Sequence, residues 1–247
     1  CLFATVAPNK PYRHNMMNEP YYPFIRWSTE HCVALAITLL ATAVLLLIAR
    51  KLSEKARFIT CRGIAVIVAA QFISEYVWRT CTDTYGSWQY NLPLHFCSFM
   101  SIFDFIALWW RWRPACTLVY FGVLVGSIQG LITPAMANGY PSMAFYVFFT
   151  AHGLLLLVAL AIPVLIGWRA RGYDDVKALL MMDAYLVLII PINLYLNTNY
   201  GYTRGIPIEG TLLDYLGSAP WYYLWAQLPV LAVFRLLMLP VHDKSED

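Results

Sequence analysis

The stretch EHCVALAITLLATAVLLLIA, residues 30–49, decides the fold class, because the 18 residues from Cys32 to Ala49 carry no charge. A helix of about 20 apolar residues crosses the ~30 Å hydrocarbon core of a bilayer. Lipid offers no hydrogen-bond partner to an open backbone, so an apolar run of this length forms a helix there. The stretch therefore predicts a membrane-spanning helix.

Six further stretches of similar length and composition follow along the chain. They are residues 61–79, 94–110, 115–133, 143–167, 177–196 and 221–240. The chain is 60% hydrophobic and only 13% charged, whereas a soluble domain carries about 25% charged residues. No alternating strand pattern suggests a barrel, and no phosphate loop, dinucleotide fingerprint or basic run suggests a nucleotide or nucleic acid. The sequence predicts an all-α polytopic membrane protein with seven transmembrane helices.

Orientation is predicted from lysine and arginine, which are enriched on the cytoplasmic side of membrane proteins. Twelve of them fall on one side of the predicted spans: Arg50, Lys51, Lys55, Arg57, Arg62, Arg111, Arg113, Arg169, Arg171, Lys177, Arg235 and Lys244. Five fall on the other: Lys10, Arg13, Arg26, Arg79 and Arg204. The N-terminus is therefore expected outside and the C-terminus inside.

The chain divides into three parts. Residues 1–26 are polar, rich in Tyr, Pro, Asn and Met and without periodicity, which indicates an extended extracytoplasmic arm. Residues 27–241 form the seven-helix transmembrane domain, and residues 242–247 form a cytoplasmic tail. Trp and Tyr residues near the span ends, Tyr222 and Tyr223 among them, are expected to anchor the helices at the interfaces.

The connection 197–220 is long and punctuated by Gly and Pro. Within it, Leu212, Leu213, Tyr215 and Leu216 are spaced to form one amphipathic turn on the membrane or over the bundle. Long ordered loops often serve as lids. The sequence leaves two interpretations of this connection open: a lid and a simple connector.

Polar residues within or beside the spans gather in the predicted outer half. They are Glu75, His95, Cys97, Gln129, Thr133, His152, Asn193, Asn197 and Gln227. A polar group facing lipid is costly, so these side chains should face the bundle interior. They predict either an outward-open cavity or hydrogen-bonding contacts that hold helices together. Asp104 and Asp183 lie deeper and are not expected to belong to this set.

Four of these residues are candidates for chemistry. His152 is expected to act as a general base or as a donor to a lipid head group, with His95 beside it and Glu75 orienting a histidine. The Glu75 carboxyl group needs a partner, for which His95, His152 and Arg79 are the candidates. Cys97 is a candidate nucleophile with His152 as its base, or a small packing residue. Gln129, Thr133, Asn193, Asn197 and Gln227 are candidate substrate-binding residues.

No metal or cofactor is expected. His95, Cys97, His152 and Glu75 are of the types that bind zinc. In a helix, however, the two side chains of His95-Phe96-Cys97 point about 200° apart, so both cannot readily face one ion unless Pro93 leaves this start non-helical.

Five strings resemble the bacterial YwaF-like family of integral membrane proteins. They are LPLHFCSF at 92–99, GSIQGLITP at 126–134, YPSMAFYVFFTAHG at 140–153, INLYLNTNYGY at 192–202 and LLDYLGSAPWY at 212–222. Their order and spacing agree from about residue 70 to residue 240. The resemblance implies a multi-pass protein of the bacterial inner membrane.

That family is distantly similar to a eukaryotic transmembrane acyltransferase family that remodels ether phospholipids. The similarity implies a Cys directly before a His at the start of one span, and a later intramembrane His. His152 matches the later histidine, whereas Leu94 stands directly before His95 and Cys97 lies three residues beyond Leu94.

Two classes of function follow. In the first, an outward-facing polar cavity binds or remodels membrane lipids. In the second, the chain is a non-catalytic accessory subunit of a larger membrane complex and contacts other membrane proteins through residues 1–26.

Overall fold

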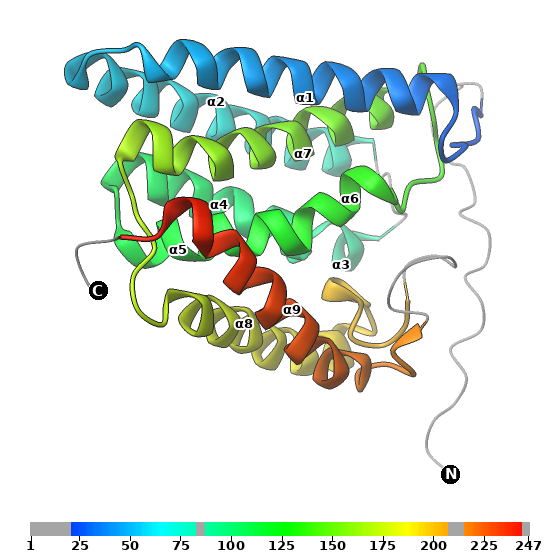
Figure 1. Cartoon of the computed structure of the whole chain (residues 1–247). Helices are drawn as coiled ribbons and strands as arrows, with labels where there is room; N and C mark the ends of the chain where they lie inside the picture. Colours follow the sequence, from blue (N-terminus) through cyan, green and yellow to red (C-terminus); the bar gives the residue numbers. More distant parts are fainter. Residues whose placement is uncertain (1–20, 83–86, 207–214, 244–247) are drawn as a thin grey trace.

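The computed structural model describes residues 21–82, 87–206 and 215–243, and its regular elements are helices (Figure 1). The α-helices are α1 (Thr29–Arg50), α2 (Glu54–Cys81), α3 (Trp88–Asn91), α4 (Phe96–Trp110), α5 (Arg113–Gly122), α6 (Ile128–Ile132), α7 (Met143–Ala161), α8 (Asp174–Leu196) and α9 (Tyr222–Met238). π-Helical segments Val123–Ser127 and Ile162–Ile166 and 3-10 turns Tyr200–Tyr202 and Leu239–Val241 extend or join them. The predicted all-α fold is confirmed.

Six helices of the described part are long and apolar enough to cross a membrane. They are Thr29–Arg50, Glu54–Cys81, Arg113–Ile132, Met143–Ile166, Asp174–Leu196 and Tyr222–Val241. The predicted spans 115–133 and 143–167 each continue through a π-helical segment. A multi-pass membrane protein is therefore confirmed, and the seventh predicted span is a shorter helix.

That shorter helix is α4, with 15 residues where residues 94–110 were expected to span the bilayer. At 1.5 Å per residue it is about 22 Å long. It begins late because Leu92 and His95, on either side of Pro93, are extended. It ends because Arg111 adopts a left-handed conformation with φ of 53°. The late start places His95 and Cys97 at the tip of a helix inside the bundle.

Two helical segments, Arg113–Ile132 and Met143–Ile166, form a central pair, and the other helices surround it. Within their apolar windows, 61% of the residues of Arg113–Ile132 and of Met143–Ile166 are buried. The corresponding fractions are 11% for α1 and 17% for each of α2, α8 and the α9 span. Figure 1 shows α5, α6 and α7 between α1 and α2 on one side and α8 and α9 on the other. The outer helices therefore present their apolar faces to lipid.

A buried histidine fixes the start of α1 against the central pair. The Nε2 atom of His31 lies 2.9 Å from the carbonyl oxygen of Leu131, and its Nδ1 atom accepts a hydrogen bond from the Trp27 amide at 3.0 Å. Because Nδ1 is the acceptor, Nε2 carries the proton that Leu131 receives. One imidazole thus links the beginning of α1 to the end of α6.

Ion pairs hold the bundle at the end where α5 and α8 begin. Asp174 contacts Arg113 at 2.5 Å, and Asp175, which is completely buried, contacts Arg235 at 2.5 Å. Arg171 contacts Asp243 at 2.9 Å. Three arginines counted on the predicted cytoplasmic side, Arg113, Arg171 and Arg235, thus also hold segments of the bundle together.

Parts of three predicted segments lie outside the described residues. These parts are residues 1–20 of the arm, residues 207–214 with Leu212 and Leu213, and residues 244–247 of the tail. The end of the arm is described: the Phe24 amide donates to the Ala137 carbonyl at 3.0 Å, and Pro23 bridges to Asn138. This short pairing places residues 21–25 beside the α6–α7 connection.

The orientation predicted from the charge count is tested by cysteine labelling. In a background with Cys1, Cys32, Cys81 and Cys97 replaced by serine, Gly205→Cys should react with a membrane-impermeant maleimide on intact cells, because its segment is expected outside. A Cβ at position 205 has room, with its nearest neighbour 3.9 Å away. Lys51→Cys, exposed at the opposite end, should react only after detergent is added. The reverse pattern would overturn the orientation.

Candidate functional site

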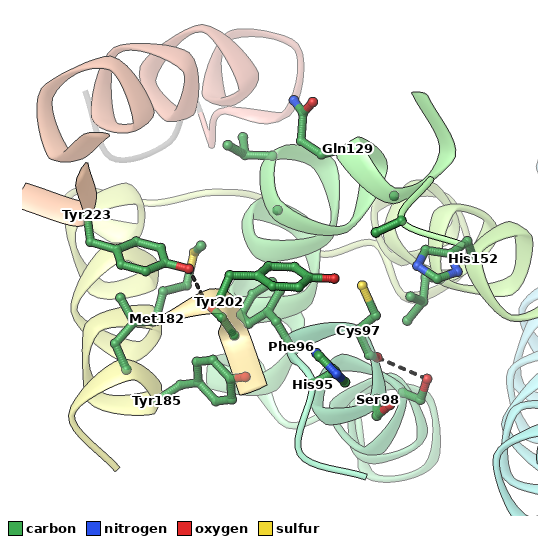
Figure 2. Close-up of a pocket in the computed structure, with 18 of the residues that line it drawn as sticks. His95, Phe96, Cys97, Ser98, Gln129, His152, Met182, Tyr185, Tyr202 and Tyr223 are labelled. Atoms are coloured by element: carbon green, nitrogen blue, oxygen red, sulfur yellow. Dashed lines mark hydrogen bonds between the residues drawn. The ribbon is translucent and has the colours of Figure 1, made fainter. Parts of the chain in front are cut away.

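A cavity of about 430 Å³ lies at the end of the bundle where α2 ends and α4 begins (Figure 2). Its lining comes from α2, α4, the α5–α6 unit, α7, α8, α9 and the turn at Tyr200–Tyr202. Seven of the nine residues proposed from the sequence line it: Glu75, His95, Cys97, Gln129, Thr133, His152 and Gln227. Residues distant in sequence therefore meet in one interior site.

The first turn of α4 brings Cys97 to His152. The Cys97 thiol and the His152 imidazole both line the cavity, and Figure 2 shows the sulfur on the side of the cavity where the ring of His152 lies. His152 Nδ1 lies 3.0 Å from the Phe148 carbonyl oxygen. A carbonyl can only accept, so Nδ1 carries a proton, and in the neutral ring Nε2 keeps a lone pair. The neutral form of His152 thus offers a basic nitrogen in the cavity that the Cys97 thiol also lines.

Close packing holds the His152 ring in place. Its ring stacks on Phe148 with a centroid separation of 4.0 Å. On its other side α6 approaches with Gly130, where a Cβ would lie 2.7 Å from both Cδ2 and Nε2 of the imidazole. Gly130 is therefore the residue that lets α6 pass beside His152.

Glu75 is paired with Arg79, one of the three partners predicted for it, and not with either predicted histidine. One carboxylate oxygen forms an ion pair with Arg79, one turn further along α2, and the other accepts from Gln71 Nε2 at 3.1 Å. Glu75 still acts electrostatically on Cys97 and on His152. Glu75 therefore lines the cavity as half of an ion pair on α2.

His95 caps the start of α4 and lies in an aromatic corner of the cavity. Its ring meets Tyr200 edge-on at 4.9 Å between centroids and lies 5.6 Å from the ring of Tyr202. These contacts fix the ring beside the first turn of α4. His95 therefore shapes the wall next to Cys97.

Asp183 corrects the sequence prediction. It was expected outside the polar set, yet it lines the cavity and accepts a hydrogen bond from Gln227 Nε2 at 3.0 Å. Asp104, by contrast, is completely buried in the helix core and is not among the cavity residues. The cavity thus has a second polar wall, made by α8 and α9.

Asn193 and Asn197 are not among the lining residues. The amide of Asn193 donates to the Tyr200 carbonyl and to Thr203 Oγ1, both at 2.7 Å. Its oxygen accepts from Thr198 Oγ1 and from the Tyr200 amide, both at 2.8 Å. Asn197 turns left-handed with φ of 53°, and its Oδ1 accepts from Arg204 Nη1 at 2.8 Å. Both residues build the turn after α8.

Sequence reasoning missed three tyrosines that line the cavity: Tyr185, Tyr202 and Tyr223. Tyr223 was interpreted as an interface anchor, and its neighbour Tyr222 is completely buried rather than interfacial. The available signal was the string NTNYGYTR, residues 197–204, in which a glycine stands between two tyrosines in a polar segment that follows an apolar span.

The arrangement offers a nucleophile and a base rather than a metal centre. No group of three His, Cys, Asp or Glu side chains suited to a metal ion occurs within residues 21–82, 87–206 and 215–243. A thiol whose proton can pass to an adjacent imidazole is a nucleophile for acyl groups. The remaining lining is mostly apolar, with Phe72, Leu155, Leu179, Met182 and Val230 among it.

Comparison with known proteins gives one finding. The model of the TMEM164 family matches residues 26–238. No curated protein and no solved structure matches the chain. The matched range includes every described helix from α1 to α9 and all the residues around the cavity.

The close approach of α6 to His152 predicts unequal effects of two glycine substitutions. Gly130→Ala should lower the stability by about 1–3 kcal/mol, because the new methyl group must displace a packed ring. Gly63→Ala is the matched control: no atom lies within 4 Å of its Cβ position, so helix propensity should leave stability unchanged or raise it. Thermal unfolding of both variants in detergent measures this, and equal unfolding temperatures would contradict the packing argument.

Proposed function

We propose that this chain, which belongs to the TMEM164 family, transfers acyl chains between membrane lipids, with Cys97 as the nucleophile and His152 as the base. One observation carries the proposal: a thiol and a basic imidazole nitrogen are neighbours inside a largely apolar cavity of a membrane bundle. A lipid ester is the acyl source that such a location supplies.

The chemistry is a two-step exchange. His152 Nε2 takes the proton of Cys97, and the thiolate attacks the ester carbonyl of a lipid. The carbon–oxygen ester bond breaks, the leaving oxygen takes the proton from the imidazolium, and a thioester remains on Cys97. A hydroxyl of a second lipid then gives its proton to His152 and attacks the thioester, and sulfur leaves as the thiolate.

The cavity wall supports a lipid substrate. Leu155, Leu179, Met182 and Val230 supply apolar surface suited to an acyl chain. Glu75 with Arg79 on one wall, and Asp183 with Gln227 on another, supply polar groups for the ester and head-group region. This division matches the usual build of small-molecule sites, which are mostly apolar with a few placed polar groups.

The placement of the site in a cell rests on the sequence. The YwaF-like strings favour a bacterial inner membrane, and the charge count favours a cavity on the outer side. In that orientation the enzyme acts on the outer leaflet. The accessory-subunit alternative rests on residues 1–26, of which 1–20 lie outside the described residues.

The proposal predicts an acyl-enzyme. Purified protein in vesicles that contain a phospholipid with an isotope-labelled acyl chain and an unlabelled lysophospholipid should move the label to the lysophospholipid. Cys97→Ser should abolish the transfer, and His152→Ala should slow it about 10²–10⁴-fold because the thiol loses its base. Intact-protein mass spectrometry should show a hydroxylamine-sensitive acyl group on Cys97.

The matched control is Cys81→Ser, which replaces an exposed free thiol at the end of α2 and should transfer normally. Undiminished transfer by Cys97→Ser would rule out the thioester route. Absence of transfer by the parent protein, together with loss of a co-purifying protein on deletion of residues 1–24, would favour the accessory subunit.

A further inference from the structure

We infer that Tyr202 is a further catalytic residue of this site: its hydroxyl donates a hydrogen bond to the acyl carbonyl oxygen as Cys97 attacks. The inference rests on the proposed acyl transfer and adds to it the group that stabilises the developing negative charge. It is drawn from the unusual way in which the structure holds this tyrosine.

The backbone at Tyr202 is in the left-handed region. Gly201 has φ of 59° and Tyr202 has φ of 58°. Glycine adopts this conformation freely, whereas a tyrosine does so at a cost of about 1–2 kcal/mol. A non-glycine residue keeps such a conformation only where surrounding contacts impose it, and such residues are concentrated at functional sites.

Here the imposing contacts come from α8 and α9. The Tyr222 hydroxyl donates to the Tyr202 carbonyl, and the Tyr223 hydroxyl donates to the Gly201 carbonyl. The turn before them is held by Asn193, whose side-chain oxygen accepts from the Tyr200 amide at 2.8 Å. A Cβ at Gly201 would lie 2.9 Å from the Tyr185 hydroxyl, so only glycine fits.

These contacts aim the Tyr202 side chain into the cavity. Its ring lines the cavity together with Cys97 and His152, with the His95 ring 5.6 Å away at its side. Figure 2 shows the ring extending across the cavity with its hydroxyl directed towards the side where Cys97 lies. In the same view the side-chain amide of Gln129 is directed away from Cys97. Tyr202 therefore supplies a donor on the face of Cys97 where a substrate carbonyl would lie.

The reaction needs such a donor. When the Cys97 sulfur bonds to the carbonyl carbon, the π electron pair moves to the oxygen, which becomes an oxyanion. The Tyr202 hydroxyl donates to that oxygen and keeps its proton. When the pair returns to re-form the carbonyl, the ester oxygen leaves with the proton held by His152. Removing one donor of this kind from an enzyme typically costs about 10²–10³-fold in kcat.

Tyr202→Phe tests the inference, because it removes one oxygen and keeps the ring. We expect kcat for label transfer in vesicles to fall about 10²-fold, with KM for the lysophospholipid changed less than threefold. The rate at which iodoacetamide alkylates Cys97 should stay within twofold of the parent, because alkylation forms no oxyanion. Tyr202→His, which restores a ring donor, should recover at least tenfold over Tyr202→Phe.

Two matched tyrosines separate chemistry from structure. Tyr195, on α8, is 89% exposed, and Tyr195→Phe should leave transfer unchanged. Tyr200→Phe removes the hydroxyl that donates to the Gln89 carbonyl at 2.7 Å, and it should lower the unfolding temperature more than Tyr202→Phe does.

Parent-like kcat in Tyr202→Phe would overturn the inference while leaving the acyl-transfer proposal intact. So would a loss that Tyr202→His does not recover, or one matched by equally slow alkylation of Cys97. If the parent protein itself forms no acyl group on Cys97, the proposed function fails and the inference fails with it.

Discussion

The structure depends on one constraint: a polar group within a bilayer must find its partner inside the protein, because lipid supplies none. The outer helices obey it by presenting apolar faces, with only 11–17% of their windows buried. The polar side chains of those helices turn inward instead, as Glu75 does with Arg79 and Gln71, and Asp183 with Gln227. Because each of these polar side chains needs a partner inside the bundle, together they give the cavity polar walls.

The same constraint explains the turn after α8. A helix that ends within the bundle leaves carbonyl and amide groups unpaired, and Asn193 satisfies several of them with one side chain. This hydrogen-bonding role of Asn193 requires a buried side-chain amide and no ligand. Asn193, which the sequence suggested as a substrate-binding residue, therefore has a structural role in the turn. This turn fixes the backbone conformation of Gly201 and Tyr202. The asparagine that holds the turn and the tyrosine that lines the cavity therefore belong to one connected arrangement.

The sequence predicted the helical class, six helices long and apolar enough to span a membrane, and most of the polar residues of the cavity, because hydropathy and the cost of exposed polar groups are local properties. It did not predict which polar residues pair with which. His95, His152 and Arg79 were all candidate partners of Glu75, and the partner is Arg79, which lies one helical turn away on the same helix. Asp183 was set apart on depth alone, since the crossing of α8 and α9 that brings Gln227 to it has no local signature. The tyrosines were missed for a similar reason: the sequence alone does not distinguish a tyrosine at the membrane interface from one that faces a cavity.

The register of α4 decides between Leu94 and Cys97 at the position that faces His152. Leu94 precedes the helix: its carbonyl accepts from the Tyr185 hydroxyl at 2.8 Å, and its side chain packs against the cluster of Tyr185, Ile189 and Tyr200. Because His95 is extended and α4 begins at Phe96, the first turn carries Cys97 round to the imidazole instead. An extended segment and a helix direct successive side chains differently. Where the chain changes from extended to helical, the position of a residue in the sequence therefore does not tell which side chain faces His152. Cys97, three residues after Leu94, is therefore the residue that the first turn of α4 places in the cavity with His152.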